Sequence, residues 1–255
     1  VQVAAAHVFR AGKDWFYPYY RDMALCASLG MSDDDFMLNA LNKEADPNSH
    51  GRQMPMHYGD KAKNIVNQSS PTGTQYLQAV GSALTSKLKG LDDVTYVSSG
   101  EGSCAQGDFH EALNWSARER LPIVFLVQNN KFAISVPVSE QLAGKSVARI
   151  ASGYEGLESV EVDGTDFLAC LPVLQAAHAR ALRGEGPTLI EAHVPRLQSH
   201  SISDNHLKYR SQTDIDREKS SCPIEQLRNY LLSNNISTAK DLDAMRAQVK
   251  AQIDE

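Results

Sequence analysis

The fold is decided by the stretch Val94-Thr-Tyr-Val-Ser-Ser-Gly-Glu-Gly102, an apolar run that ends in an acidic residue between two glycines. Its first residues, Val94 to Ser98, predict a buried strand. The segment from Asp108 to Arg120 predicts an amphipathic helix, and Ile123-Val-Phe-Leu-Val127 predicts the next strand. A strand, a helix and a parallel strand in succession form one right-handed crossover. The stretch therefore predicts a parallel α/β sheet covered by helices on both faces.

Polar residues stand at the end of both predicted strands. Glu101 follows the first strand, and the pair Asn129-Asn130 follows the second. The carboxyl ends of parallel strands meet at one edge of a sheet, where α/β proteins bind ligands. Carboxylate and amide oxygens are ligands that suit Mg²⁺. The sequence therefore predicts a divalent cation between Glu101 and Asn130.

A dinucleotide-binding turn is the competing interpretation, because Gly100-Glu-Gly-Ser-Cys-Ala105 fits the pattern G-x-G-x-x-A. That pattern expects an acidic residue at the end of the next strand to bind a ribose. Here the strand ends in Gln128-Asn129-Asn130. An acid within the turn would also repel a bare pyrophosphate but favour one that carries a metal ion. Both observations favour the metal site.

The composition restricts the class of protein. The formal charge of −6 and the lack of a basic stretch argue against nucleic-acid and membrane-surface roles. No apolar segment reaches the ~18 residues that a membrane-spanning helix needs. The scattered cysteines (Cys26, Cys104, Cys170, Cys222) predict reduced thiols, not disulfides or zinc ligands. Because the chain starts at Val1 without a methionine, we expect it to be trimmed, with residues missing at either end.

Apolar periodicity, together with capping and turn residues, predicts further helices and strands. The patterns predict helices at Tyr17–Leu29, from Pro71-Thr72 to about Lys89, after Asp166, at Pro223–Ser233 and at Ala239–Glu255, and strands at Ser159–Val162 and Thr188–Ala192. Thr72 and Gln75 are expected to form a capping box, and Pro172 is expected to kink its helix or shift its start. The stretch from Asp46 to Gly59 is too irregular for an element. The polar segment from Arg196 to Ser211 predicts a long functional or disordered loop.

The motifs together resemble a known family. Gly100-Glu-Gly with Asn129-Asn130 resembles the thiamine diphosphate motif G-D-G…N-N. Further matches are Tyr19-Tyr20-Arg21, Gly51-Arg-Gln-Met-Pro55, Gln68-Ser-Ser-Pro71, Gly107-Asp-Phe-His-Glu111 and Ala133-Ile-Ser135. From about Phe16 to Leu232 the chain resembles the alpha subunit of the thiamine-dependent 2-oxo acid dehydrogenase component. Glu101 in place of Asp, with Gly51-Arg-Gln-Met-Pro55, favours the branched-chain (2-oxoisovalerate) type.

The resemblance implies a three-layer α/β fold that binds thiamine diphosphate. The cofactor domain would cover residues 1–221, with an active-site loop at 196–211, and peripheral helices would occupy 222–255. The implied activity is that of an oxidoreductase of the 3-methyl-2-oxobutanoate dehydrogenase type. It would decarboxylate a branched-chain 2-oxo acid and reductively acylate a lipoyl domain.

Three alternatives stay open. The substrate could be pyruvate or acetoin in place of a branched-chain acid. The chain could be an inactive structural fragment that lacks its partner. A dinucleotide-dependent oxidoreductase is the third alternative, and NAD binding would test it.

The resemblance also implies partners. A beta subunit or fused beta domain would supply the carboxylate that activates the aminopyrimidine ring, in an alpha2beta2 heterotetramer. The lipoyl domain of an acyltransferase would accept the acyl group, and no nucleic acid or membrane is implied. The expected compartment is the cytoplasm in bacteria or the mitochondrial matrix in eukaryotes.

Site residues are carried over by position. Glu101, the Asn130 side chain and the Phe132 carbonyl would hold Mg²⁺, and Ser69, Pro71, Thr74 and Gln75 match a potassium site. The positions that would contact the cofactor are Tyr19, Tyr20, Arg21, Ser70, Thr72, Gly102, Ser103, Gln128, Asn130, Phe132, Ala133, Ile134 and His200. One departure is Gln128, since relatives with Arg there use it on the diphosphate.

Substrate and loop residues complete the expected site. Tyr20, Met54 and His57 would line the substrate pocket, and His200 would be the catalytic histidine. Arg196, Asp204, Tyr209 and Arg210 match the loop that orders with the cofactor and docks the lipoyl domain. Ser201 occupies a place that is phosphorylated in mammalian relatives.

Overall fold

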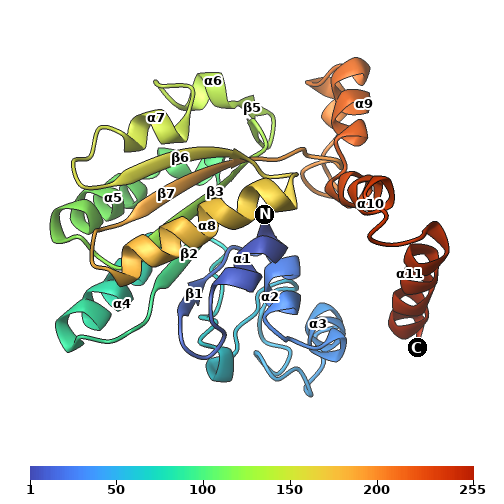
Figure 1. The fold of residues 1–255 in the computed structure, drawn as a ribbon, viewed down its shortest axis with the longest axis horizontal. Coiled ribbons are helices and arrows are strands. Elements are labelled where there is room, and N and C mark those ends of the chain that lie inside the picture. The colour runs from blue at the N-terminus through green and yellow to red at the C-terminus, as the bar shows by residue number, and fades with distance from the viewer.

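A computed structural model describes residues 1–255 and has a five-stranded parallel sheet at its centre (Figure 1). The order across the sheet is β1 (Trp15–Tyr17), β2 (Thr95–Gly100), β3 (Ile123–Asn129), β7 (Thr188–His193) and β6 (Glu158–Asp163). All neighbouring strands are parallel. Every carboxyl end therefore lies at the same edge of the sheet, as the crossover predicts.

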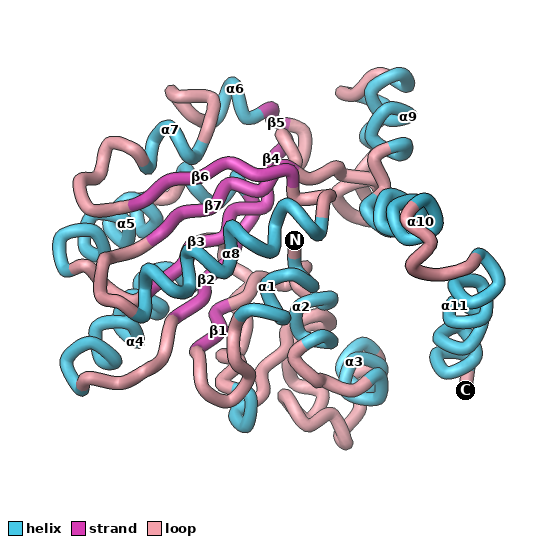
Figure 2. The backbone as a smooth tube through the Cα atoms, viewed as in Figure 1, coloured by secondary structure: helices cyan, strands magenta, loops and turns pink.

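Helices cover both faces of this sheet (Figure 2). Successive residues of β3 point to opposite sides: Val124 and Leu126 join one buried cluster, and Phe125 joins the other. The first cluster contains residues of α1, α2 and α8, and the second contains residues of α4, α5 and α7. The predicted three-layer α/β fold with two covered faces is confirmed.

The helices have the following bounds. They are α1 (Gln2–Val8), α2 (Met23–Ser28), α3 (Asp33–Ala40), α4 (Gln75–Lys89), α5 (Gly107–Glu119), α6 (Val138–Gln141), α7 (Val147–Ala151), α8 (Phe167–Leu182), α9 (Gln212–Ser220), α10 (Pro223–Ser233) and α11 (Ala239–Asp254). Short 3₁₀ turns occur at Lys61–Lys63, Glu101–Ala105 and His206–Lys208, and a small antiparallel hairpin joins β4 (Phe132–Ala133) to β5 (Val136–Pro137). None of these helices has the length and apolarity needed to cross a bilayer.

Two local predictions were wrong. The segment Tyr17–Leu29 is not one helix, because Trp15–Tyr17 pairs with β2 as an edge strand and α2 starts only at Met23. The capping box of Thr72 and Gln75 does not form. Helix α4 begins at Gln75, whose side-chain amide donates to the Ser98 carbonyl at 2.9 Å, and the preceding Gly73 has a φ of +91°.

Pro172 does not shift the start of its helix. Asp166 accepts hydrogen bonds from the amides of Leu168 and Ala169, so α8 starts where that cap predicts and continues through the proline. The stretch Asp46–Gly59 contains no helix or strand, as expected. Helices α10 and α11 are confirmed near their predicted bounds and lie beyond the carboxyl edge of the sheet (Figure 1).

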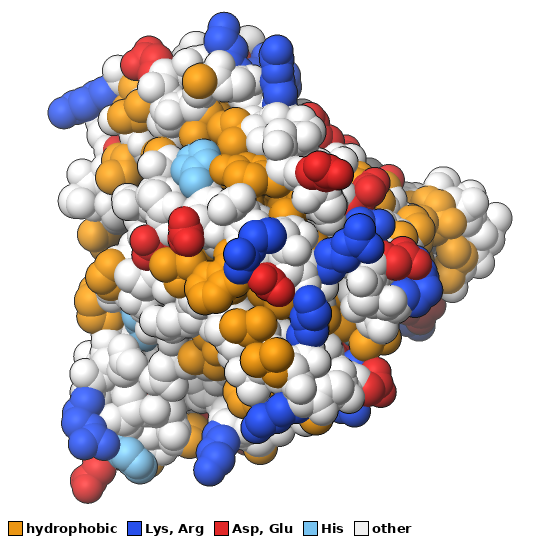
Figure 3. Space-filling model, turned by 90° about the vertical axis from the view of Figure 1, so that its left-hand side faces the viewer, with side chains coloured by type: hydrophobic (Ala, Val, Ile, Leu, Met, Phe, Trp, Pro, Cys, Tyr) orange, Lys and Arg blue, Asp and Glu red, His pale blue; other side chains and the backbone are white.

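The surface nearest α4 and α5 is mixed in character. Lys, Arg, Asp and Glu side chains are scattered there among apolar ones, without an extended area of one charge (Figure 3). This pattern agrees with the modest net charge of −6.

Asp14 forms a buried polar cluster at the opposite, amino edge of the sheet. Its side chain is 0% exposed and accepts hydrogen bonds from the Val94 amide at 2.9 Å and the Arg10 guanidinium at 2.7 Å. The Nε2 atom of His178, on α8, lies 3.0 Å from its other oxygen. The carboxylate thus joins β1, β2 and α8 just before the strands begin.

We expect Asp14→Asn to lower the free energy of unfolding at pH 7 by about 3 kcal/mol, because it removes the charge of a buried carboxylate that holds Arg10, His178 and the Val94 amide. Burial raises the pKa of Asp14, but hydrogen bonds from His178 and Arg10 outweigh this and lower it from 3.8 to about 2. The stabilisation is therefore complete above pH ~4 and is lost as the pH falls toward 2. Denaturant unfolding at several pH values measures this, and an equal difference at pH 2.5 and pH 7 would contradict it.

Candidate functional site

A cavity of about 1550 Å³ lies between the carboxyl ends of the strands and helices α10 and α11. The predicted residues that line it are Tyr19, Tyr20, Arg21, Ser69, Thr72, Gln75, Glu101, Gly102, Ser103, Gln128, Asn130, Phe132, Ala133, Ile134, Arg196 and His200. These come from segments after β1, β2, β3 and β7, which the parallel topology brings together. Among the predicted residues, Ser70, Pro71, Thr74, Met54 and His57 do not line this cavity.

Glu101 and Asn130 meet at this edge, as expected. The Glu101 side chain is buried, and its Oε2 accepts a hydrogen bond from the Asn130 amide at 3.2 Å. Its other oxygen, Oε1, is buried without any hydrogen-bond partner. Burial raises the pKa of the Glu101 carboxyl above its ordinary value, because desolvation outweighs the hydrogen bonds it receives. An unpartnered buried carboxylate oxygen in a cavity is chemically suited to a cation.

The donor set around Glu101 fits a hard divalent cation that keeps other ligands. No group of three or more His, Cys, Asp or Glu side chains gathers here. The side-chain oxygens that meet here are the Glu101 carboxylate and the Asn130 amide, and the Phe132 carbonyl is the third ligand that the resemblance implies. Mg²⁺ commonly takes one or two carboxylates and completes its shell with water and phosphate. The residues therefore fit Mg²⁺ that arrives with a phosphate ligand.

Gly102 lets two segments approach closely beside Glu101. A Cβ atom added at this position would lie 2.7 Å from the Cβ of Ala133 on β4. Real side chains do not tolerate such a contact, so only glycine lets the turn after β2 pack against the β4–β5 hairpin. Ser103 follows in the short turn before α5, which begins at this edge because it connects the end of β2 to the start of the parallel β3. Main-chain N–H groups at such a helix start bind anions.

Arg21 connects the start of the site to the active-site loop. Its guanidinium donates to the His200 carbonyl at 2.9 Å and lies over the Tyr20 ring at 4.8 Å. The His200 amide in turn donates to Asp204 at 2.8 Å. Burial, followed by the charges of Arg21 and Arg196, lowers the pKa of the His200 imidazole. His200 is therefore neutral at pH 7 and faces the cavity.

A second group of predicted residues packs beside Tyr20, outside the cavity lining. The Tyr20 ring stacks on the His57 ring with centroids 5.9 Å apart, and His57 Nε2 lies 2.6 Å from the Ser70 hydroxyl. Ser70 also lies 3.5 Å from the sulfur of Met54, which is 63% exposed. The positions predicted for substrate binding are thus neighbours in space.

The segment predicted to bind potassium is ordered by internal contacts. The Thr74 hydroxyl donates to the Pro71 carbonyl at 3.1 Å, and Gln75 donates to the Ser98 carbonyl. Ser69 and Gln75 line the cavity. Potassium binding at these residues stays a prediction.

Gln128 is engaged within the chain. Its amide nitrogen donates to Asp22 at 2.6 Å, and its amide oxygen accepts from Gln2 at 2.9 Å. Asp22 is fully buried and also accepts from the Ser98 hydroxyl. Burial raises its pKa to about 6 despite these bonds. Contact between Gln128 and a diphosphate stays a prediction, but both ends of its amide already have partners.

Asp22 was missed as a site residue, although it follows Tyr19-Tyr20-Arg21 directly. Its signal in the sequence is an acid at the start of the apolar segment that forms α2. Its partners, Ser98 and Gln128, come from β2 and β3, and nothing in the local pattern pairs them.

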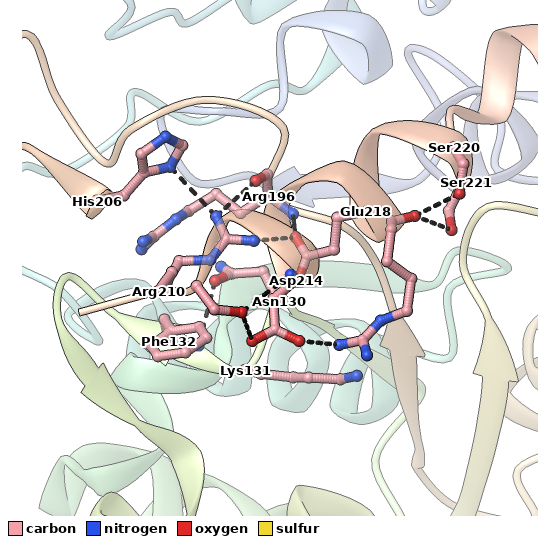
Figure 4. Close-up of polar contacts among 12 residues, drawn as sticks. Asn130, Lys131, Phe132, Arg196, His206, Arg210, Asp214, Glu218, Ser220 and Ser221 are labelled. Carbon is pink, nitrogen blue, oxygen red and sulfur yellow. Dashed lines mark hydrogen bonds and ion pairs between the residues drawn. The ribbon is translucent and has the colours of Figure 1, made fainter. Parts of the chain in front are cut away.

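The loop from Arg196 to Ser211 is held against the hairpin by two arginines (Figure 4). Arg196 donates to the Ile134 carbonyl at 2.6 Å and to the Tyr209 hydroxyl at 2.7 Å. The Arg210 guanidinium is buried, pairs with Glu218 at 2.7 Å and lies 5.6 Å from the Phe132 ring centroid.

The residues predicted to dock a partner differ in exposure. Arg210 is buried and anchors the loop to the protein, whereas Ser201 is exposed and Asp204 is partly exposed. Tyr209 donates to Asp204 at 2.6 Å, which lowers the pKa of that carboxyl. Docking of a lipoyl domain on this loop stays a prediction.

The whole chain, residues 1–255, matches the family model described as "Dehydrogenase E1 component". The 2-oxoisovalerate dehydrogenase subunit alpha of Bacillus subtilis is 41% identical over 100% of this chain and 77% of its own length. The 3-methyl-2-oxobutanoate dehydrogenase subunit alpha of Mycobacterium tuberculosis is 38% identical over 98% of this chain and 65% of its own. The mitochondrial 2-oxoisovalerate dehydrogenase subunit alpha of Mus musculus is 36% identical over 94% and 54%.

A solved structure from Mycobacterium smegmatis overlaps 76% of this chain and 31% of its own, with 21% identity and a TM-score of 0.49. The family model covers every residue of the chain, and the Bacillus subtilis relative at 41% identity aligns with all of it. The chain belongs to the dehydrogenase E1 component family.

Proposed function

We propose that this chain is the alpha part of a 2-oxo acid dehydrogenase that binds thiamine diphosphate through Mg²⁺ and acts on branched-chain 2-oxo acids. The observation that carries the proposal is the unpartnered, buried Oε1 of Glu101 beside Asn130 in a large cavity. The alpha-subunit relatives from Bacillus subtilis and Mycobacterium tuberculosis support the substrate class.

Each part of the site has a task in this proposal. Thiamine diphosphate, when bound, supplies the electron sink for loss of CO₂ from the 2-oxo acid. Glu101 and Asn130 would hold the metal, with the Phe132 carbonyl as a third ligand. Main-chain N–H groups of Gly102 and Ser103 would bind the diphosphate, and Arg21, which lines the same cavity, would pair with it.

The remaining residues would act on the substrate. Tyr20 lines the cavity, and we assign it to the substrate side chain together with His57, which stacks on its ring, and Met54. Ser70, which lies beside both His57 and Met54, would contact the cofactor. His200, neutral and at the cavity, can accept or donate a proton near working pH. A beta partner would supply the carboxylate for the aminopyrimidine ring, and a lipoyl domain would accept the acyl group.

Binding of the cofactor tests the proposal. The chain should be mixed with a beta subunit, and thiamine diphosphate binding should be measured by calorimetry with Mg²⁺ and with EDTA. We expect tight binding only when both Mg²⁺ and the partner are present. Failure of Mg²⁺-dependent binding in the complex would overturn the proposal and favour an inactive fragment.

Turnover of a panel of 2-oxo acids tests the substrate class. We expect kcat/KM for 3-methyl-2-oxobutanoate to exceed that for pyruvate by at least about tenfold, because added methyl groups in an apolar pocket are worth ~1–3 kcal/mol. Acetoin serves as the third arm of the panel. A preference for pyruvate or acetoin would reject the branched-chain assignment while leaving the cofactor assignment intact.

A further inference from the structure

A second glutamate, Glu191, lies buried behind the metal-binding turn. It is on β7 in the middle of the sheet and is 0% exposed. Its Oε1 accepts a hydrogen bond from the side-chain amide of Asn129 at 2.6 Å. Its Oε2 accepts from the Ser146 hydroxyl at 2.8 Å and the Ala148 amide at 2.7 Å. Both oxygens therefore have donors, in contrast to those of Glu101.

Asn129 connects Glu191 to the turn that follows β3. Its side-chain oxygen accepts from the Lys131 amide at 2.8 Å, and Lys131 has a φ of +73°. This left-handed conformation is unfavourable for lysine and needs support from its surroundings. The side chain of Asn129 thus bridges Glu191 on one strand to a strained position two residues further on.

The same turn presents the metal ligands. The Asn130 amide donates to Glu101 at 3.2 Å, and the Asn130 side-chain oxygen accepts from the Phe132 amide at 3.2 Å. Any rotation at Lys131 would move both Asn130 and the Phe132 carbonyl. The two asparagines therefore have different tasks, because Asn130 faces the cavity while Asn129 faces Glu191.

Glu191 keeps its charge in this position. Burial raises its pKa, but hydrogen bonds from Ala148, Asn129 and Ser146 outweigh this and lower the pKa below its ordinary value. A charged acceptor makes stronger hydrogen bonds than a neutral one, so it can hold the Asn129 amide in a fixed rotamer. The hydrogen bonds from Ser146 and Ala148 also fix Glu191 to the start of α7.

We propose that Glu191 is a positioning residue for the metal site, acting through Asn129 to hold the Asn130–Phe132 turn in its binding conformation. The inference rests on the proposed function, because it assumes that this turn binds Mg²⁺. Outer partners of metal ligands typically change metal affinity by ~10–100-fold when they are removed.

The test compares Glu191→Ala, Asn129→Ala and the double variant in the complex with a beta subunit. We measure Mn²⁺ affinity by electron paramagnetic resonance in the presence of thiamine diphosphate. Each single variant is expected to bind Mn²⁺ about 10–100-fold more weakly. The double variant should be no weaker than the weaker single one, because both residues act through one contact. Wild-type affinity in Asn129→Ala would overturn the inference, even if Glu191→Ala does not fold.

Two controls separate positioning from general stability. Asp14→Asn removes a buried carboxylate at the opposite edge of the sheet and should lower stability without changing the Mn²⁺ affinity. Ser146→Ala removes only the α7 side of the network and should leave the affinity within about threefold. An Asp14→Asn loss as large as that of Glu191→Ala would mean that stability alone is being measured.

Hydrogen exchange of the metal-free complex separates this inference from the proposed function. The segment 129–133 should exchange at least tenfold faster in Asn129→Ala than in the wild type, and at the wild-type rate in Asp14→Asn. A wild-type complex that binds no Mn²⁺ would refute the proposed function, and the exchange rates would still decide whether Glu191 and Asn129 hold the turn. Unchanged exchange in both single variants would refute the positioning role.

Discussion

Replacing Glu101 with Gln is expected to weaken Mg²⁺-dependent binding of thiamine diphosphate by roughly 100-fold or more, a loss of about 3 kcal/mol. The substitution keeps the size of the side chain but removes the charge of the buried, unpartnered Oε1. Calorimetry on the complex with a beta subunit measures the loss. Unchanged affinity would show that Glu101 is not a metal ligand.

The same variant should be more stable than the wild type when no metal is present. Burial raises the pKa of Glu101, so the metal-free wild type loses stability as the pH rises through the range from the unfolded value, 4.5, to the folded one. Glu101→Gln removes this loss, because it never carries the charge. The matched control is Glu158→Gln, an exposed glutamate at the start of β6, which should alter neither affinity nor stability. A metal-free Glu101→Gln protein less stable than the wild type would contradict this account.

Replacing His200 with Ala is expected to lower kcat with a lipoylated acceptor domain about 100-fold or more, the usual loss for a proton-transfer residue. The main chain of His200 is held by Arg21 and Asp204, so the loop should keep its place when the ring is removed. Cofactor affinity should therefore fall much less than kcat, because only the contact of the ring itself is lost. Steady-state turnover together with calorimetry separates the two effects.

The pH profile adds a second readout for His200. Burial and the charge of Arg21 lower its pKa, so the neutral ring is retained to below pH 6.5. Activity that requires the neutral ring should fall only on the acid side of that value, and the variant should lack this limb. His7→Ala is the control, because His7 lines the same cavity from α1 and should leave kcat within about twofold. An equal loss in both variants would reject the catalytic role.

Much of the fold could be predicted because its signals are local. The buried runs at β2 and β3 and the periodic helix between them specify one crossover, and its handedness is nearly invariant. That topology alone places Glu101 beside Asn130. The predictions that were wrong concern segments with weak local signals. Strand β1 has only three residues, and Gln75 donates to Ser98 in place of closing a capping box.

The supporting polar residues could not be predicted in the same way. Glu191 sits in a run that reads as an ordinary buried strand, and Asp22 sits at the start of a short helix. The role of each depends on which strand lies beside it. Strand β7 inserts between β3 and β6, and this order brings Glu191 to Asn129.

The sequence by itself determined the parallel α/β class, the acidic turn at Glu101 and its meeting with Asn130, since these depend on periodicity and on one crossover rule. Only the tertiary structure decided which residues hold that site: Glu191 bonded to Asn129, Asp22 bonded to Gln128, and Arg210 on the buried side of the loop, paired with Glu218. The physical reason is that a buried polar group needs a partner, and the partner comes from whichever segment packs beside it, however distant in the chain.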